Sequence, residues 1–225
     1  MYGSASGSEE LRIICAHRRF VVVDKPAGLL SVPGLGVAGA DNLASRVAGA
    51  FPGASGPLVC HRLDQATSGV MVFGLDADAQ RLISLQFQYG RVDKRYEALV
   101  WGEPKERAGR VTLPIMADWP NRPMQKVDHE QGKRAETLWR VVGRGEIDGA
   151  VVTRVELTPL TGRTHQLRLH AATSVAKGGI GYPMVGDRLY DPGRAAARLM
   201  LHARWIEFTD PETLRRVRFE SAVPF

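Results

Sequence analysis

The sequence has 225 residues, of which 44% are hydrophobic and 24% are charged. These proportions match folded globular proteins and exclude a wholly disordered or a collagen-like chain. The N-terminal stretch lacks the apolar core of a secretory signal, and no window approaches the ~18 consecutive apolar residues that span a bilayer. We therefore expect a cytoplasmic protein that does not enter a membrane.

The chain is basic, with 30 Lys and Arg against 24 Asp and Glu and a formal net charge of +6. This balance favours a polyanionic partner such as nucleic acid, although many proteins carry such a charge for solubility alone. The two cysteines, Cys15 and Cys60, are far apart in sequence and have no spacing typical of metal ligands or of a disulfide framework. We expect no bound metal.

Strand-like and helix-like patterns follow one another irregularly in the first part of the chain. Asn42 and Asp76 each precede a helical pattern and can cap it through the side chain, and Gly90 can end the second helix. The predicted elements are, in order, two short strands within 11–24, a loop over 28–41, a helix over 43–51, a strand over 70–75 and a helix over 76–90.

The rest of the chain is predicted mainly as strands. These are expected over 94–101, 135–142, 151–157, 199–208 and 217–219, and one further helix is expected over 164–173, starting near Arg163 or Thr164. So few helices do not suit a doubly wound parallel sheet, so we predict an α+β fold with a mixed, mainly antiparallel sheet flanked by helices and loops. No repeat or Pro-rich linker interrupts the chain, which indicates a flexible N-terminus over 1–10 and one compact domain over 11–225.

The segment His61-Arg62-Leu63-Asp64-Gln65-Ala66-Thr67-Ser68-Gly69 places a carboxylate between two apolar stretches, at the expected end of a strand. A carboxylate with limited access to water needs a cation or a raised pKa. Asp64 is therefore a candidate for chemistry. The alternative is an Asx turn, in which the Asp64 side chain only caps the backbone near Thr67 and Ser68.

The segment Leu160-Thr161-Gly162-Arg163-Thr164-His165-Gln166-Leu167-Arg168-Leu169-His170 brings two arginines and two histidines onto one turn and helix. Such a unit can hold a phosphate or a buried carboxylate, and Arg168 is a candidate partner for Asp64. The alternative is a solvated basic face shared by His165 and Arg168. A histidine metal site is less favoured, because no carboxylate or cysteine stands at ligand spacing.

Two more segments stand out. Tyr96 lies on a predicted strand with Ala98 and Val100 on its face, where it is either a core aromatic or a ring at the rim of a pocket. Lys25 ends a strand before Pro26 and either extends to solvent or guards a pocket. The glycines that follow Lys25 have neither Walker nor dinucleotide-binding spacing, so no nucleotide cofactor is expected.

Together these segments resemble the RluA family of pseudouridine synthases, from about Leu11 to the C-terminus. HRLDQATSG at 61–69 is similar to the catalytic motif of that family, KRYEALV at 94–100 to its tyrosine motif and TGRTHQLRLH at 161–170 to its arginine motif, in family order. Further similarities lie at 25–30, 186–190 and 201–203. The stretch from Asp118 to Lys126 resembles the short members typified by RluA, which lack an N-terminal S4 RNA-binding domain.

The resemblance implies the pseudouridine synthase catalytic fold and an enzyme that isomerises uridine in RNA to pseudouridine without a cofactor. It assigns the catalytic carboxylate to Asp64, which either attacks the sugar or the ring or removes a C2′ proton, and the sequence does not choose between these routes. Arg168 would pair with Asp64 and keep it ionised. Tyr96 would stack on the uracil and offer its phenol as a base for the C5 proton.

RNA binding is also implied by the resemblance. The target uridine must leave its stack, and Arg62 would fill the vacancy that the flipped base leaves. The RNA-binding residues expected are His61, Arg62, Arg122, Lys126 and Arg163, with Lys133 and Arg134 as further phosphate contacts. One departure from the family is a longer segment over 171–182, which ends in Tyr182 where histidine is common and bears on RNA specificity.

Two other functions compete with this one. An RNA-binding module of the same fold could have lost catalysis, but Asp64, Tyr96 and Arg168 are all present. A hydrolase that releases uracil needs a positioned water and a second acid, and we identify neither. The expected substrates are loops of large-subunit ribosomal RNA, the anticodon stem-loop of tRNA, or both, and the expected oligomeric state is a monomer.

Overall fold

The structure, a computed structural model, describes residues 10–34, 41–194 and 196–225. Its contacts divide the chain into two compact units. The first takes the chain up to Lys94 and resumes for Ala203–Pro224, and the second takes Arg95–His202 with Phe225. The predicted flexible segment 1–10 lies outside the described residues apart from Glu10, as does part of the predicted loop over 28–41.

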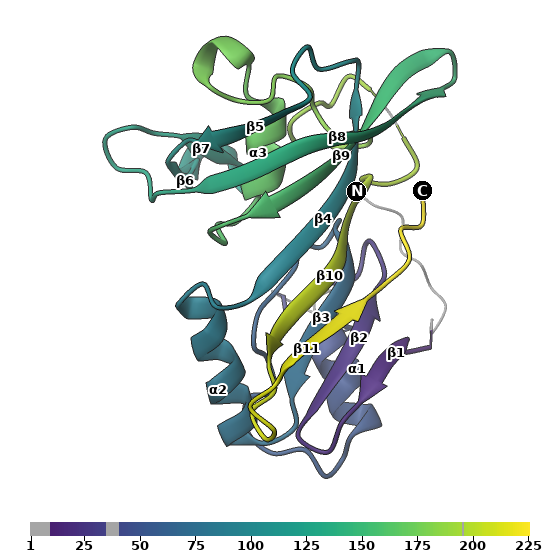
Figure 1. Cartoon of the computed structure of the whole chain (residues 1–225), viewed down its shortest axis with the longest axis vertical. Coiled ribbons are helices and arrows are strands. Elements are labelled where there is room, and N and C mark those ends of the chain that lie inside the picture. Colours follow the sequence, from purple (N-terminus) through teal and green to yellow (C-terminus); the bar gives the residue numbers. More distant parts are fainter. Residues whose placement is uncertain (1–9, 35–40, 195) are drawn as a thin grey trace. The chain divides into compact units, whose positions relative to one another are not determined.

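The first unit combines strands β1, β2, β3, β10 and β11 with helices α1 and α2 (Figure 1). The strand order is β1-β2-β3-β10, and β11 pairs with β10. The pairs β1/β2, β2/β3 and β10/β11 are antiparallel. The bounds are β1 Ile13–Ala16, β2 Phe20–Lys25, α1 Leu43–Ala50, β3 Ser68–Gly74, α2 Ala77–Gln88, β10 Leu201–Thr209 and β11 Arg216–Glu220.

Both helices of this unit begin where the capping residues predict. The Ser45 N–H donates to the Asn42 side chain at 3.0 Å, and the Ala79 N–H donates to Asp76 at 2.8 Å. The Asp76 carboxylate also accepts two hydrogen bonds from Arg19, each 2.9 Å long. These bonds lower the pKa of Asp76 to about 2, so the cap stays charged and suits the positive end of the α2 dipole.

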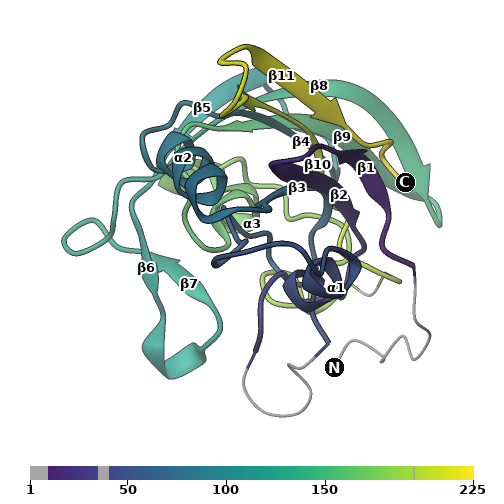
Figure 2. The same cartoon turned by 90° about the horizontal axis from the view of Figure 1, so that it is seen from below.

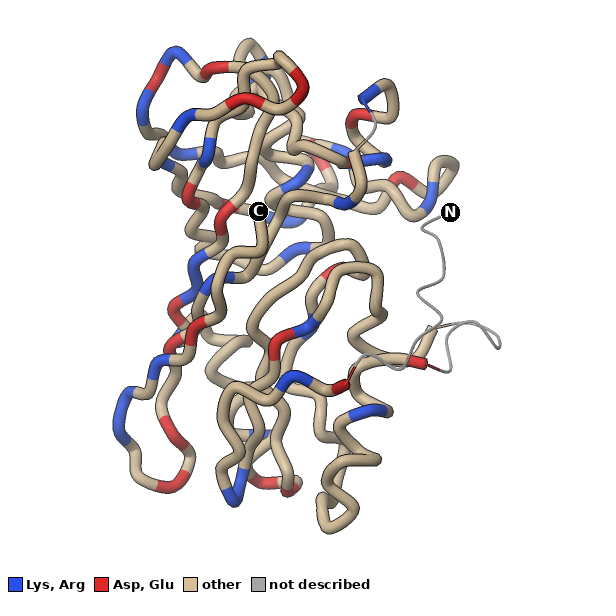
Figure 3. The backbone as a smooth tube through the Cα atoms, turned by 90° about the vertical axis from the view of Figure 1, so that its right-hand side faces the viewer, with Lys and Arg blue, Asp and Glu red and all other residues tan. Residues whose placement is uncertain are grey.

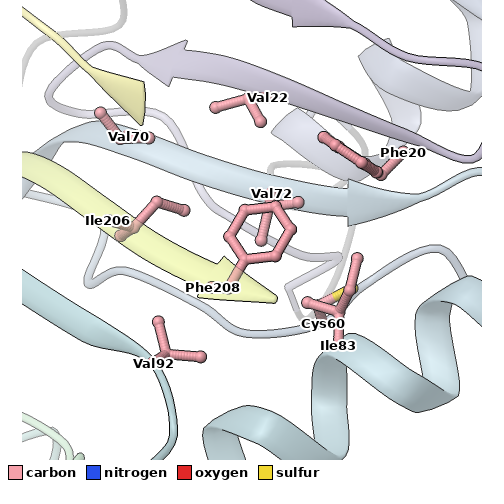
Figure 4. Close-up of a cluster of buried hydrophobic side chains, with 9 residues drawn as sticks. All are labelled: Phe20, Val22, Cys60, Val70, Val72, Ile83, Val92, Ile206 and Phe208. Atoms are coloured by element: carbon pink, nitrogen blue, oxygen red, sulfur yellow. The ribbon is translucent and has the colours of Figure 1, made fainter. Parts of the chain in front are cut away.

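One face of the first sheet is covered by α2. Alternate residues of the strands point to this face, and Ile83 of α2 packs among them (Figure 4). The buried cluster is Phe20, Val22, Cys60, Val70, Val72, Ile83, Val92, Ile206 and Phe208. Because β3 is buried along its whole length, the chain that enters it is held at a fixed position. That entering chain carries Asp64.

Gly69, at the start of β3, permits a close approach to β10. Its φ is +117°, and a Cβ built there would lie 2.3 Å from the main-chain oxygen of Ala203. Both the conformation and the space therefore require glycine. The motif that contains Asp64 thus includes a glycine that is required for close packing between two strands.

We predict that Gly69→Ala lowers the free energy of unfolding by about 3 kcal/mol or more, because backbone atoms must move to admit the methyl group. Gly53→Ala is the matched control, since a Cβ at Gly53 meets nothing within 4 Å. Urea unfolding followed by circular dichroism measures both variants. Equal stability of the two would show that β3 and β10 do not approach as described.

The second unit has a four-stranded antiparallel arrangement in the order β4-β9-β8-β5. Strands β6 and β7 form a separate antiparallel pair. We call residues 115–127 the arm, and Figure 2 shows it reaching away from the main sheet of this unit. The bounds are β4 Asp93–Trp101, β5 Ala108–Thr112, β6 Ile115–Ala117, η2 Trp119–Asn121, β7 Gln125–Val127, β8 Glu136–Ile147, β9 Ala150–Pro159, α3 Gln166–Ala172 and η3 Val175–Lys177.

These elements confirm the predicted α+β class and the mainly antiparallel sheet. The helix predicted over 164–173 begins only at Gln166, because His165 takes a left-handed conformation with φ 54°. The short strands β5, β6 and β7 were not predicted. They have 5, 3 and 3 residues, too few to show a clear alternation of polar and apolar side chains.

Among the helices of the described residues, none is both long and apolar enough to cross a bilayer. Lys and Arg positions interleave with Asp and Glu positions along the described chain (Figure 3). The net charge of +6 therefore does not by itself mark one face for RNA. The arrangement of individual arginines has to be considered instead.

Candidate active site

The loop that carries Asp64 is tied down by a buried lysine. Lys25, the last residue of β2, has no exposed surface. Its ammonium donates to the main-chain oxygens of Pro26 at 3.0 Å, Leu29 at 2.7 Å and Gln65 at 3.1 Å. A buried ammonium is stable only when its charge is met by hydrogen bonds, so Lys25 holds the segments before and after Gly28 against the Asp64 loop.

Further hydrogen bonds fix both neighbours of Asp64. The Leu63 N–H donates to Ser31 Oγ at 3.1 Å, and that hydroxyl donates to the Leu63 oxygen at 2.6 Å. Gln65 and Gly28 exchange two bonds, one from the Gly28 N–H at 2.8 Å and one from the Gln65 amide at 3.0 Å. Asp64 therefore stands between two residues whose main chain is held.

The turn after Asp64 closes through the backbone. The Thr67 N–H donates to the main-chain oxygen of Asp64 at 3.0 Å. In the Asx-turn alternative, the Asp64 side chain would accept the hydrogen bond that closes this turn. In the structure, the main-chain oxygen of Asp64 accepts it. Asp64 is partly exposed and Arg62 is exposed, so both side chains are accessible to a ligand.

His61 connects this loop to β3 and α2. Its Nε2 accepts the Val72 N–H at 3.1 Å, and its ring stacks on Phe87 with centroids 4.1 Å apart. Burial, and to a smaller extent the charge of Lys94, lowers the pKa of His61 to about 3. The ring is therefore neutral at pH 7, as an Nε2 that accepts a bond requires. His61 thus has a structural role, and its contact with RNA stays a prediction.

Tyr96 lies on β4 in the second unit. Ala98 and Val100, on the same face of the strand, have no exposed surface, whereas Tyr96 is partly exposed. It pairs with Leu157 of β9. Tyr96 is thus at the point where the buried face of β4 reaches solvent, which suits a ring that stacks on a ligand.

Helix α3 carries a buried ion pair. Arg168 Nε donates to Asp187 Oδ2 at 2.9 Å, and Nη2 donates to Oδ1 at 2.6 Å. The side chains are 3% and 0% exposed. The solvated basic face considered for His165 and Arg168 is therefore wrong, because both residues are buried. Instead α3 places a guanidinium inside the protein and holds it at two points.

Asp187 is itself positioned by the turn around it. Gly186 has a φ of +74°, and a Cβ there would lie 1.9 Å from the Arg198 main-chain oxygen. The Leu189 and Tyr190 N–H groups donate to Asp187 Oδ1 at 3.1 and 3.2 Å. The carboxylate therefore accepts bonds from the guanidinium and from its own turn, so the orientation of Arg168 is set by main-chain geometry.

Tyr190 joins this centre to the arm. Its hydroxyl lies 3.0 Å from His165 Nδ1, and it accepts the Gln125 N–H of β7 at 2.9 Å. The Arg168 guanidinium lies over the Tyr190 ring at 5.3 Å from the centroid. One side chain thus touches the start of α3, the buried arginine and the first residue of β7.

The arm presents the predicted RNA-binding residues Arg122 and Lys126 on its surface. Arg122 lies over the exposed ring of Trp119 at 4.3 Å from the centroid, and Lys126 pairs with Asp128 at 3.4 Å. Arg163 is exposed in the loop before α3. These three side chains belong to the same unit as Arg168 and Tyr96.

The predicted site residues divide between the two units. Asp64, His61 and Arg62 belong to the first unit, and the residues of the second unit are Tyr96, Arg122, Lys126, Arg163 and Arg168. The first group is brought together by one loop. In the second, Tyr190 and the start of α3 bring Arg168 together with the arm.

Sequence reasoning did not find the roles of Lys25 and Asp187. Lys25 was read as a residue that extends to solvent or guards a pocket, and its signal was a lysine at the end of a mainly apolar strand. Asp187 stands in a Gly-Asp-Arg-Leu-Tyr stretch that resembles the family, but nothing in that stretch shows which cation it binds. Lys25 and Gln65 are 40 positions apart and Arg168 and Asp187 are 19 positions apart, so only the fold reveals these contacts.

The longer segment over 171–182 folds back along α3. The Ile180 N–H donates to the main-chain oxygen of His170 and the Tyr182 N–H to that of Ala171, both at 2.9 Å. The Tyr182 ring packs against Gly102, where an added Cβ would lie 3.2 Å from the ring. The segment therefore closes the end of α3. Within the described residues, no group of three His, Cys, Asp or Glu side chains is placed to hold a metal ion.

Comparison with known proteins gives one consistent result. The family described as RNA pseudouridylate synthase matches residues 19–173. The protein named dual-specificity RNA pseudouridine synthase RluA from Yersinia pestis is 41% identical over 216 residues, which cover 95% of this chain and 99% of that protein. The protein of the same name from Pasteurella multocida is 43% identical over 218 residues, covering 96% and 94%.

Solved structures agree with these relatives. Human RNA pseudouridylate synthase domain containing 1 superposes with a TM-score of 0.77 at 30% identity, covering 99% of this chain and 87% of that one. Human RNA pseudouridylate synthase domain containing 4 gives a TM-score of 0.72 at 25% identity, covering 95% and 88%. The catalytic fold expected from the sequence is confirmed.

The buried histidines predict how stability depends on pH. Burial lowers the pKa of His170 to about 4, against about 6.5 in the unfolded chain. Between these values the unfolded chain binds the extra proton, so the free energy of unfolding falls as the pH drops. The slope from His170 is at most about 1.4 kcal/mol per pH unit.

Urea unfolding at pH 6.5 and 5 should show a smaller loss of unfolding free energy for His170→Gln than for the unchanged protein. His129→Gln, at an exposed position, is the control and should lose as much as the unchanged protein. Parallel curves for all three would contradict it.

Proposed function

The chain belongs to the RNA pseudouridylate synthase family, and on that premise we propose how its residues convert uridine in RNA to pseudouridine. The reaction breaks the bond between N1 and C1′ and joins C5 to C1′ of the same nucleotide. The C5 proton leaves and N1 takes up a proton, so no oxidant, reductant or cofactor is consumed. The protein must supply a carboxylate, hold the detached uracil and move that proton.

Asp64 is the carboxylate in this proposal. It either attacks C1′ or the ring to form a covalent intermediate, or removes the C2′ proton to give a glycal. The observation that carries the proposal is the fixed backbone on both sides of Asp64, through Lys25, Ser31 and Gly28. A reacting group held in one position loses little freedom when substrate binds, which lowers the barrier.

Arg168 is the cation that pairs with Asp64 and orients it in this proposal. A guanidinium has five N–H donors and can bind two carboxylates at once. The pair with Asp187 uses Nε and Nη2 in a two-point contact, which fixes the plane of the guanidinium. Asp187 is then a positioning residue that acts on Asp64 through Arg168. An arginine held in this way offers its donors in a fixed direction.

Tyr96 supports the ring in this proposal. It stacks on the extruded uracil, which keeps the base near C1′ while it rotates, and its phenol takes the C5 proton. Arg62 fills the gap that the flipped base leaves in the RNA. The arm, with Arg122 and Lys126 exposed, contacts phosphates. The target is a loop uridine, where unstacking costs least.

The relatives named above are dual-specificity RNA pseudouridine synthases. We propose the same breadth here, with a loop of ribosomal RNA and the anticodon stem-loop of tRNA as substrates. The enzyme would act as a cytoplasmic monomer and form no complex with a nucleotide cofactor. The hydrolase alternative predicts free uracil as product, so product analysis separates the two.

We predict that Asp64→Asn abolishes conversion and leaves RNA affinity within about tenfold, because phosphate contacts supply most of that affinity. Tritium release from RNA labelled at C5 of uridine measures conversion, and filter binding measures affinity. Asp148→Asn, at an exposed turn, is the control and should convert normally. Substantial turnover by Asp64→Asn would remove Asp64 from its role.

We also predict that Asp187→Asn lowers kcat by about tenfold or more, a loss of ~1.4 kcal/mol in transition-state stabilisation, with little change in KM. Because Arg168 would be less well held, its donors would no longer keep a fixed direction toward Asp64, which lowers kcat, whereas RNA binding and therefore KM would change little. Arg168→Met should be more damaging than Arg168→Lys. A kcat that falls only in proportion to the fraction of unfolded protein, measured by circular dichroism, would indicate only a structural role for Asp187.

A further inference from the structure

A buried carboxylate lies under two exposed arginines at the start of β8. Glu136 is 3% exposed. Its Oε2 pairs with Arg134 at 2.8 Å, and its Oε1 forms an ion pair with Arg110 of β5. The Arg134 and Arg110 side chains are 74% and 57% exposed. One carboxylate therefore holds two guanidiniums side by side at the surface of the second unit.

A third arginine joins them from a separate loop. Arg163 Nε donates to the main-chain oxygen of Arg134 at 3.1 Å. We call Arg110, Arg134 and Arg163 the arginine corner. Two of these guanidiniums pair with the carboxylate of Glu136, and the third binds the main-chain oxygen of Arg134, so the three arginines carry more positive charge than Glu136 neutralises. Neutralising Glu136 needs only one cation, so its charge alone does not account for the cluster.

The backbone beneath the corner is fixed by Gln166. This buried amide donates to the main-chain oxygen of Glu136 at 2.9 Å, and its oxygen accepts the main-chain N–H of Arg163 at 3.0 Å and the Thr161 hydroxyl at 2.7 Å. Thr161 Oγ1 in turn accepts the Glu136 N–H at 2.9 Å. The start of β8 and the loop before α3 are therefore held together as one piece.

We propose that the arginine corner is a docking site for the phosphodiester backbone of RNA, and that Glu136 is its positioning residue. The site rests on the proposed function in that its ligand is the substrate RNA. A planar guanidinium binds phosphate through two parallel N–H···O bonds, and holding it in advance lowers the entropy lost on binding. Gln166 stands two residues before Arg168 on α3, so RNA that docks at the corner is held near the start of the helix that carries Arg168.

The competing explanation is that Arg110 and Arg134 serve only to stabilise buried Glu136. It predicts that removing them lowers the melting temperature and leaves RNA binding unchanged. The docking site predicts the opposite distinction: a loss of RNA affinity whose size depends on salt. Salt dependence is therefore the measurement that separates them.

The test is fluorescence anisotropy of a labelled tRNA anticodon stem-loop transcript, titrated with the full chain between about 50 and 200 mM KCl. For Arg110→Gln, Arg134→Gln and Arg163→Gln, the slope of log Kd against log salt should fall by about 0.7–0.9 for each arginine removed. Arg144→Gln is the matched control, because Arg144 is 56% exposed and paired with Glu103 of the same unit. Slopes that do not change, or that fall equally for Arg144→Gln, would overturn the proposal.

Glu136→Gln tests the positioning role separately. It keeps the size of the side chain and makes the protein more positive, so charge alone predicts tighter binding of RNA. We expect weaker binding, by about threefold or more, and a smaller salt slope, because the guanidiniums lose their anchor. Binding as tight as that of the unchanged protein, in a variant that melts normally, would overturn this role. If Glu136→Gln does not fold, the surface arginine variants still decide the docking site.

The proposed function and the docking site can fail separately. Pseudouridine formation is read from the same RNA by tritium release, independently of anisotropy. If the arginine variants have reduced salt slopes but the unchanged protein converts no uridine, the docking site is supported and the proposed function is contradicted. If the unchanged protein converts uridine and the salt slopes of the variants are unchanged, the proposed function is supported and the docking site is contradicted. For the arginine variants we expect the KM for RNA to rise, because each substitution removes a contact to the phosphate backbone.

Discussion

The buried pair between Arg168 and Asp187 is the interaction on which the second unit depends. Each ion alone would cost several kcal/mol at that depth, so each keeps the other in place. Asp187 also accepts N–H groups of its own turn, and the Tyr190 hydroxyl of that turn contacts His165 and Gln125. One ion pair therefore sets the position of α3, the 186–190 turn and the base of the arm. The guanidinium proposed to meet Asp64 thus has a fixed orientation before RNA arrives.

In the first unit the position of the Asp64 carboxylate is also fixed in advance, here by hydrogen bonds to the main chain around it. Lys25 uses its charge within the protein, where it binds three main-chain oxygens, and so fixes the loop instead of contacting a ligand. His61 is kept neutral by burial and acts as a hydrogen-bond acceptor. Lys25 and His61 could each be taken for a reactive group, but both have structural roles. Together they hold the loop that carries Asp64. Pre-organised groups of this kind raise kcat, because their orientation is not lost when the substrate reacts.

Local features were predictable and distant partners were not. Asn42 and Asp76 cap helices as their sequence context indicates, and Tyr96 lies on a strand as expected. The start of α3 was misplaced because a left-handed His165 leaves no signal in residue type. The motifs around Asp64 and Arg168 were found through their resemblance to a family. The pairs of Lys25 with Gln65 and of Arg168 with Asp187 join residues 40 and 19 positions apart, and no periodicity encodes them.

The most direct test of the account is a double-mutant cycle between Asp64 and Arg168, read as the free energy of unfolding. Asp64→Asn, Arg168→Gln and the double variant are unfolded in urea beside the unchanged protein. If the carboxylate and the guanidinium form a pair, the two substitutions should be non-additive by about 1 kcal/mol or more. Additivity within about 0.3–0.5 kcal/mol would show that the two groups act independently, and would contradict the account.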